Sequence, residues 1–180
     1  MPILGIMASA MSANLWQPEG AYDSLATVTL SASTASVTFA GIPSTYKHLQ
    51  LRTLAQQAST GGYVEIILNN ATFNRRHYLY GNGASALAGE DTTNAPGIFS
   101  SAFSSGNSVF AGSVIDILDY ASTSKNKVTR SLGGVDNNSS GAIYLMSSLY
   151  TSSAAITSMT INAISQNFTA NSTFALYGVK

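Results

Sequence analysis

Charged side chains are scarce in this chain of 180 residues. Aspartate, glutamate, lysine and arginine make up 9% of it, against about 25% in an ordinary soluble domain, and eight cations balance eight anions. Binding to nucleic acid depends on lysine and arginine side chains that neutralise phosphates, so the composition argues against nucleic acid as a partner. The zero net charge also argues against electrostatic attachment to an anionic membrane.

Cysteine is absent, and long hydrophobic runs are missing as well. Without cysteine the chain has neither a disulfide framework nor a thiolate metal site. No apolar run approaches the roughly 18 residues of a membrane-spanning helix, so we expect no membrane insertion. The mean hydropathy of +0.15 nevertheless indicates a folded chain, because disordered chains combine low hydrophobicity with high net charge.

The first residues are apolar, and no basic side chain precedes Lys47. A cleaved signal peptide would need a basic segment ahead of its apolar stretch, so we expect the segment to be retained. We assign residues 1–20 to an extended N-terminal arm that anchors the protein, and residues 21–180 to a single β-sandwich domain. The anchoring side chains of the arm are expected to be Ile3, Leu4, Ile6, Met7, Met11, Leu15 and Trp16.

Strand patterns run through the rest of the chain. Leu49 and Leu51 alternate with Gln50 and Arg52, for example, which is the period of a half-buried strand. No segment has the period of an amphipathic helix. The pattern predicts an all-β fold, an antiparallel β-sandwich with a jelly-roll-like arrangement. The predicted strands are 25–30, 35–39, 48–54, 63–68, 73–80, 109–120, 125–132, 142–150, 156–162 and 172–179.

The segments between the strands give three more specific expectations. The short polar turn 31–34 predicts a hairpin between the first two strands. Gly133 and Gly134 are expected to begin a turn region that ends at Gly141. Residues 84–107, rich in small and turn-forming side chains, are predicted to form a long loop with at most a short strand at 98–103.

Hydroxyl and amide side chains supply the polar surface in place of charges. Serine and threonine together number 44 and asparagine 13, and many of them alternate with apolar residues, as expected for sheets with one face in water. Lysines on edge strands normally prevent sheets from pairing edge to edge. Their scarcity predicts that strand edges and neutral faces are covered by neighbouring subunits, and therefore that the protein is an oligomer.

The chain offers few groups for catalysis or metal binding. His48 and His77 are its two histidines, no Gly-x-Ser-x-Gly motif occurs, and no histidine or cysteine spacing indicates zinc. Residues 136–141 have oxygen donors spaced as in a calcium loop but lack its bidentate glutamate. We therefore predict no catalytic residue, no cofactor and no metal, with a hydrolase kept as an alternative.

The predicted strand 109–120 contains two aspartates. Asp116 and Asp119 are three residues apart, so they are expected on opposite faces of the strand, which disfavours the paired carboxylates of a glycosidase. One of them is expected to form an ion pair with Arg75, Arg76 or Arg130.

Tyrosine is the commonest aromatic residue, with nine copies. Tyrosine rings stack on the apolar faces of sugars and amides bond sugar hydroxyls, so a tyrosine-rich neutral surface also fits glycan binding. Packing in a core or an interface explains the same residues equally well. The candidate glycan contacts are Tyr78, Tyr80, Tyr144 and Tyr150.

Six segments carry a resemblance to a known group of proteins. They are 2–9 (PILGIMAS), 36–52 (SVTFAGIPSTYKHLQLR), 76–83 (RHYLYGNG), 114–120 (VIDILDY), 130–134 (RSLGG) and 174–180 (FALYGVK). In this order they resemble small virion structural proteins of tailed bacteriophages, of the decoration or tail-fibre-like kind. The resemblance covers nearly the whole chain, is weakest in 84–107, and supplies no catalytic residue.

The resemblance and the composition together predict a non-enzymatic bacteriophage structural protein at the virion surface. We expect it to decorate the capsid or form a short fibre, to associate as a homotrimer and to contact other virion proteins through its arm. The arm could instead be buried between the protomers of the trimer. Two alternatives remain, a tail fibre or baseplate appendage that touches host surface glycans, and a secreted carbohydrate-binding module.

Overall fold

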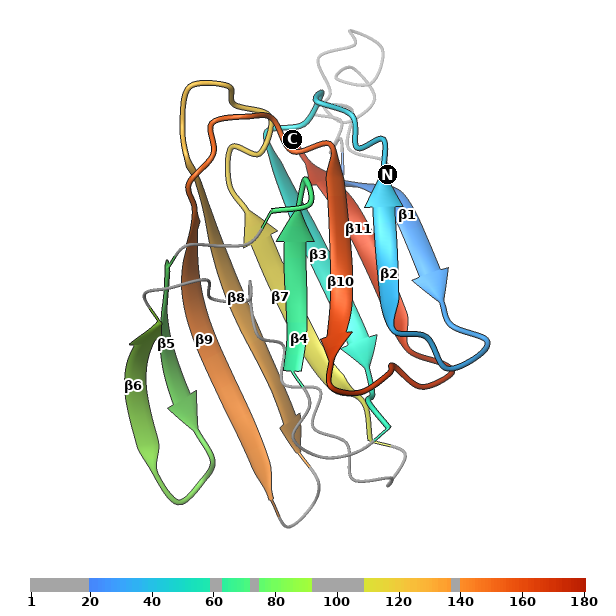
Figure 1. Cartoon of the computed structure of the whole chain (residues 1–180), viewed down its shortest axis with the longest axis vertical. Helices are drawn as coiled ribbons and strands as arrows, with labels where there is room; N and C mark the ends of the chain where they lie inside the picture. The colour runs from blue at the N-terminus through green and yellow to red at the C-terminus, as the bar shows by residue number, and fades with distance from the viewer. Residues whose placement is uncertain (1–19, 59–62, 72–74, 92–108, 137–139) are drawn as a thin grey trace, which may run out of the picture.

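The structure is a computed structural model that describes residues 20–58, 63–71, 75–91, 109–136 and 140–180. Within these ranges the regular elements are eleven strands, without any helix, arranged in two layers (Figure 1). The strands are β1 (Tyr22–Thr29), β2 (Ser36–Ala40), β3 (His48–Ala55), β4 (Tyr63–Leu68), β5 (Arg75–Gly81), β6 (Ala86–Asp91), β7 (Ala111–Ile117), β8 (Lys127–Asp136), β9 (Gly141–Tyr150), β10 (Ser158–Ile164) and β11 (Thr173–Val179).

The strands form two antiparallel sheets. The large sheet has eight strands in the order β1-β11-β3-β7-β8-β9-β5-β6, and the small sheet has three in the order β2-β10-β4. In Figure 1 the small sheet lies in front of one half of the large sheet, whereas β9, β5 and β6 extend to the left of it. The expected all-β antiparallel sandwich is confirmed.

The chain passes back and forth between the two layers. β11 lies between β1 and β3 in the large sheet, and β10 lies between β2 and β4 in the small sheet. This interleaving of strands from the two ends of the chain is the Greek-key order of a jelly-roll-like sandwich. The hairpins β5–β6 and β8–β9 then widen the large sheet on one side.

Alternating side chains of the central strands build the core between the layers. Leu49 and Leu51 of β3 and Ile115 of β7 are fully buried, and Ile66 of β4 and Met159 of β10 meet them in the same hydrophobic cluster. Full burial of one such side chain stabilises the fold by about 1.5–3 kcal/mol. The core therefore lies between the small sheet and the half of the large sheet that contains β11, β3 and β7.

The start of β1 and the end of β11 lie at one end of the sandwich, and the β5–β6 turn lies at the other. At one end, the backbone N–H of Lys180 donates to the Ala21 carbonyl at 3.2 Å, and the Lys180 ammonium lies 3.2 Å from the Asp23 carboxylate. The chain therefore enters β1 and leaves β11 at the same place. The β5–β6 turn at residues 82–85 lies at the opposite end (Figure 1).

The predicted hairpin between the first two strands is wrong. β1 pairs with β11 and β2 pairs with β10, so the turn at 31–34 carries the chain from the large sheet to the small one. The alternating pattern indicates which face of a strand is buried, but it does not say which strand lies beside it.

Two further expectations about turns are corrected. Gly133 and Gly134 lie inside β8, and a Cβ added to Gly134 would come within 2.9 Å of the Ala142 carbonyl oxygen, so glycine here permits the close approach of β9. β6 occupies 86–91, in the segment expected to be a loop, because pairing with β5 outweighs its weak strand pattern. The segment 98–103 lies outside the described residues.

Candidate functional site on the outer face of the large sheet

The large sheet has an outer face, which we define as the face turned away from the small sheet. On this face the register places Val114 of β7 beside Leu132 of β8, Leu132 beside Leu145 of β9, and Leu145 beside Leu79 of β5. Their exposed fractions are 41, 51, 51 and 56%. We call these four residues the aliphatic row.

The polarity of β8 is the reverse of that in a free-standing sandwich. Lys127, Thr129 and Ser131 are buried, whereas Val128 and Leu132 are 40 and 51% exposed. A sheet with one face in water normally turns its aliphatic side chains inward and its polar ones outward. The expectation that hydroxyl-rich faces meet water is therefore wrong for β8.

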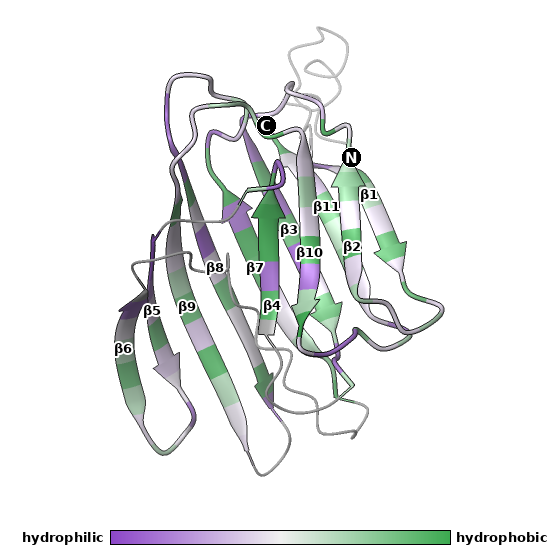
Figure 2. Ribbon diagram, in the orientation of Figure 1, coloured by the Kyte–Doolittle hydropathy of each residue, from purple (hydrophilic) through white to green (hydrophobic). Residues whose placement is uncertain are grey.

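The apolar surface extends beyond the aliphatic row. Leu54 of β3 lies opposite Gly112 of β7, and Ile143 of β9 lies two residues before Leu145. They are 53 and 57% exposed. Figure 2 shows hydrophobic positions recurring along β8, β9, β5 and β6, the half of the large sheet that the small sheet does not overlie. Contiguous apolar patches of more than a few hundred Å² mark interaction sites on soluble proteins.

A shallow groove of about 710 Å³ crosses the outer face beside the aliphatic row. Gly112 and Gly134 are paired across β7 and β8 and form its floor, and its walls include Val114, Leu132 and Ile143. A Cβ added to Gly112 would meet no heavy atom within 4 Å, so the space above this glycine is open. The groove exists because two neighbouring strands carry glycine at paired positions.

Arg52 lines the groove on its β3 side and is held in place by its neighbours. The guanidinium carbon lies 4.9 Å from the ring centroid of Tyr22 and 4.6 Å from that of Tyr177. Its Nε donates a hydrogen bond of 2.7 Å to the side-chain carbonyl of Gln50, whose amide donates in turn to Asp116 at 2.8 Å. Two aromatic rings and a chain of hydrogen bonds therefore orient this cation.

A row of polar side chains runs beside the aliphatic row. The Arg130 guanidinium lies 3.8 Å from the Asp116 carboxylate, and His77 lies 3.1 Å from Glu90. Asp116 thus has one of its expected arginine partners, although this ion pair is partly exposed to solvent. Asp119 does not share the strand with Asp116, because β7 ends at Ile117.

The candidate glycan tyrosines do not form a single surface. Tyr150 is 3% exposed and belongs to the hydrophobic core, so its ring cannot stack on a sugar, and the expectation is wrong for this residue. Tyr80 and Tyr144 are partly exposed cross-strand neighbours whose ring centroids are 4.6 Å apart. Tyr78 lies beside Gly89, where an added Cβ would clash with its ring. These tyrosines lie on the face opposite the aliphatic row.

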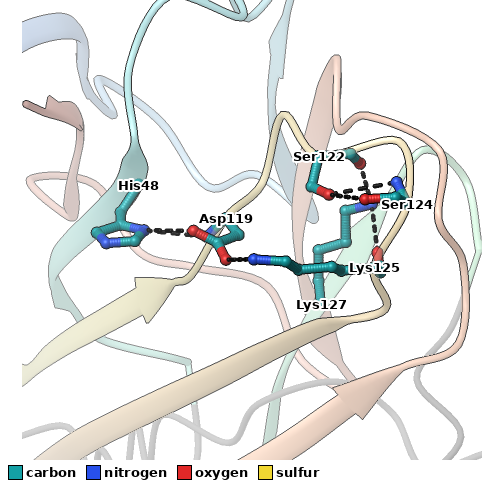
Figure 3. Close-up of polar contacts among 6 residues, drawn as sticks. All are labelled: His48, Asp119, Ser122, Ser124, Lys125 and Lys127. Carbon is teal, nitrogen blue, oxygen red and sulfur yellow. Dashed lines mark hydrogen bonds and ion pairs between the residues drawn. The ribbon is translucent and has the colours of Figure 1, made fainter.

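A polar cluster follows β7 at the turn into β8 (Figure 3). The Lys125 ammonium donates a hydrogen bond of 2.8 Å to the Asp119 carboxylate, and this bond lowers the pKa of Asp119 below its ordinary value. The backbone N–H of Asp119 donates to Nδ1 of His48 at 2.9 Å. The cluster ties the turn to the start of β3.

Lys127 is the buried cation of the same region. Its side chain is fully buried, and its ammonium donates to the backbone carbonyls of Ser122, Lys125 and Ser152 at 2.6, 3.0 and 3.2 Å. Burial lowers the pKa of Lys127, and the three carbonyls use all three of its donors. Figure 3 shows this side chain inside the loop that it holds closed. Its role is structural.

Replacing Asp119→Asn tests the electrostatic part of the turn cluster. Because the folded-state pKa of Asp119 is lowered, its carboxylate stabilises the protein above the unfolded-state pKa of about 3.8, and this contribution is lost as the pH falls through the folded value. The variant should therefore show a weaker loss of stability below about pH 4 than the parent protein. Asparagine tolerates the left-handed backbone at this position (φ 49°), so the turn is kept.

Urea titrations at several pH values between 2.5 and 7 provide the measurement. Equal slopes of unfolding free energy against pH for the two proteins below pH 4 would show that the Lys125–Asp119 bond does not stabilise the fold.

The described ranges contain neither a serine–histidine pair for catalysis nor a cluster of metal ligands. There, neither His48 nor His77 hydrogen-bonds to a serine hydroxyl, and no three His, Asp or Glu side chains are grouped to hold a metal ion. No helix in this part of the chain is long and apolar enough to cross a membrane. Residues 137–139 of the calcium-like loop and the anchoring side chains of the arm lie outside the described residues.

The outer face was not identified from the sequence. The strand 125–132 alternates in the expected way, but alternation alone does not say which set of side chains faces the core. Comparisons of the chain with protein-family models, with curated proteins and with solved structures found no match. Its function is therefore inferred from its residues and their geometry.

Proposed function

We propose that this chain is a non-enzymatic structural protein of a bacteriophage virion. It decorates the capsid or forms a short fibre at the virion surface, associates as a homotrimer and contacts other virion proteins. The resemblance of the six sequence segments supports a place in a phage virion. The outer face of the large sheet supports association with other protein subunits.

The observation that carries the assembly role is the reversed polarity of the outer face. Val114, Leu132, Leu145 and Leu79 stand side by side and half exposed, while hydroxyls of β8 are buried. Covering one half-exposed aliphatic side chain is worth about 1 kcal/mol at 25 cal/mol per Å², so covering the row drives association by several kcal/mol. A row of aliphatic side chains facing outward leaves apolar surface in water, and such a surface is typical of an interaction site.

Some of the charged groups on this face already have partners within the subunit. Asp116 pairs with Arg130 and His77 contacts Glu90 within one subunit, so docking would not leave these groups as isolated buried charges. The net charge of zero also removes long-range repulsion between copies. Both properties suit a subunit that is packed among others.

Cryo-electron microscopy of the phage whose genome encodes this chain tests the proposal. We expect density for the two-layer sandwich on the head or the tail, with the outer face of the large sheet against a neighbouring protein. A particle that lacks this density, from a phage in which the protein is expressed, would contradict the proposal. Deleting residues 1–16 then tests the arm, because particles that still carry the shortened protein would show that the arm is not the anchor.

The Tyr80–Tyr144 pair favours glycan binding as a second candidate function. The two rings are partly exposed and lie 4.6 Å apart on the face opposite the aliphatic row, a size that suits stacking on one sugar ring. A glycan array with the isolated protein tests it. Binding that is lost in Tyr80→Ala would support a host-contacting appendage or a carbohydrate-binding module, and an array without signal would contradict both.

A further inference from the structure

We infer that strand β6 binds the β6 strand of a second copy of this chain, edge to edge and antiparallel, about a two-fold axis that passes between the two Ala88 residues. The inference goes beyond the proposed function, because it concerns the edge of the large sheet and not the outer face. It is compatible with a homotrimer, since a two-fold contact joins subunits of different trimers.

The first observation is that β6 has an open edge. β6 is the last strand of the large sheet and pairs only with β5. In the described part of the chain, the backbone of residues 86–90 is hydrogen-bonded to nothing except β5. Alternate backbone groups of an edge strand point away from its neighbour, so they are a template on which another strand can pair.

The second observation is that β6 lacks features that normally keep a strand edge from pairing. β1, at the other edge of the large sheet, has a β-bulge between Ser24 and Ala26. The register of β6 with β5 is regular along the strand, and β6 contains neither proline nor lysine. Bulges, prolines and lysines are devices by which natural sheets block their edges. The β6 edge is therefore free to pair.

The third observation is that the sequence of β6 matches itself in one register. Opposite residues of an antiparallel pair share a face, so a two-fold axis must pass through a pair of identical residues. With the axis at Ala88, Leu87 lies opposite Gly89 of the second copy, and Glu90 lies opposite Ala86. Residues 86–90 of both strands are then paired, and no two like charges are opposite each other.

The neighbouring registers fit less well. With the axis at Gly89, the apolar Leu87 would lie opposite the acidic Asp91 of the second copy. With the axis at Leu87, only residues 86–88 of β6 would be paired. The strand cannot be lengthened at that end, because the Asn82 side chain accepts hydrogen bonds of 3.0 and 2.8 Å from the backbone N–H groups of the two residues before β6.

The register centred on Ala88 also extends the apolar surface on both sides of the sheet. On the outer face, Ala88 lies beside Leu79, so the aliphatic rows of the two copies join through the two alanines. On the opposite face, Leu87 is 57% exposed, and the Tyr78 ring lies where a Cβ of Gly89 would be. Leu87 of each copy therefore covers the Tyr78 ring of the other. Such a self-complementary patch is what a two-fold contact between copies requires.

Single cysteines in the full-length protein test the inference. The chain has no cysteine, so a disulfide in a single-cysteine variant joins two copies. Ala88→Cys should form a disulfide-linked dimer on mild oxidation, because opposite Cα atoms lie about 4.5–5.5 Å apart, within the range of a disulfide. Ala86→Cys is the matched control, since Ala86 is exposed on the same face of the same strand. Its two thiols would be four residues out of register, more than about 13 Å apart, and should stay reduced.

Two lysine variants should change self-association differently. Ala88→Lys places like charges opposite each other at the axis and should weaken the contact by at least about tenfold. Ala86→Lys places its charge opposite Glu90 of the second copy and should leave the contact as tight as in the parent protein, or tighter. Sedimentation equilibrium measures the contact as the increase of mass with protein concentration, and thermal unfolding shows that each variant is folded.

Three results would each overturn the inference. They are equal disulfide formation by Ala88→Cys and Ala86→Cys, no disulfide in Ala88→Cys, and self-association of Ala88→Lys equal to that of the parent protein. The outcome is separable from that of the proposed function. If Ala88→Cys forms the dimer but the virion lacks the protein, the β6 contact stands and the virion role fails. If the virion carries the protein but the dimer does not form, the reverse holds.

Discussion

The double substitution Leu132→Lys with Leu145→Glu should reduce incorporation of the protein into particles by about 100-fold or more, without a matching loss of stability. The two residues are cross-strand partners at the centre of the aliphatic row, each 51% exposed. Charges at the centre of a docking surface must be desolvated when it closes, and substitutions of the few hot-spot residues near the centre of an interface cost about 2 kcal/mol or more. The opposite charges face each other across the strands, so the isolated subunit remains folded and its net charge stays at zero.

A matched pair on the small sheet provides the control. Thr38 and Thr160 are also cross-strand partners, with their hydroxyl oxygens 3.0 Å apart. Thr38→Lys with Thr160→Glu introduces the same charges on the other outer surface of the sandwich, and incorporation should remain close to that of the parent protein. Incorporation is measured by quantitative mass spectrometry of purified particles, and thermal unfolding checks the fold. Equal losses in both double variants would show that the outer face of the large sheet is not the assembly surface.

Lys127→Met should destabilise the fold by about 3 kcal/mol, although methionine keeps most of the apolar stem. The substitution leaves the carbonyls of Ser122, Lys125 and Ser152 without their common donor. Unpaired buried polar groups cost about 1–3 kcal/mol each, and partial access to water reduces the sum. The loop between β7 and β8 and the segment after β9 should therefore separate.

Urea denaturation measures this loss, and Lys125→Met is the control. Lys125 is exposed and makes a surface ion pair with Asp119, so its replacement should lower the free energy of unfolding much less than Lys127→Met does. If Lys127→Met were as stable as the parent, the three carbonyls would be satisfied by water, and the buried ammonium would not hold the loop.

The alternating pattern of side chains predicts most strands because alternation is a local property. In β3, Leu49 and Leu51 point into the core and Arg52 points out, as their spacing indicates. In β8 the same alternation exists, but the buried set contains Lys127 and Thr129 and the exposed set contains Leu132. Hydrophobicity alone assigns these faces the wrong way round, because alternation does not say which set of side chains faces the core.

The site around Arg52 could not be predicted for a different reason. Its stacking partners Tyr22 and Tyr177 come from β1 and β11, the first and last strands. They meet because β1 pairs with β11 and β11 with β3, a long-range arrangement that local spacing does not specify. The sequence predicted the pair of Asp116 with an arginine only as one of several options, because which strand lies beside β7 was unknown.

The start of β1 and the end of β11 lie together, and this has a practical consequence for fusions to the protein. The backbones of Ala21 and Lys180 are hydrogen-bonded to each other at one end of the sandwich, and the β5–β6 turn lies at the other end. A tag fused after Lys180 therefore emerges at the end of the sandwich where β1 begins. The turn at 82–85 is exposed, and Gly83 has a φ of 83°, so a foreign epitope inserted after Gly83 would project from the far end of each subunit.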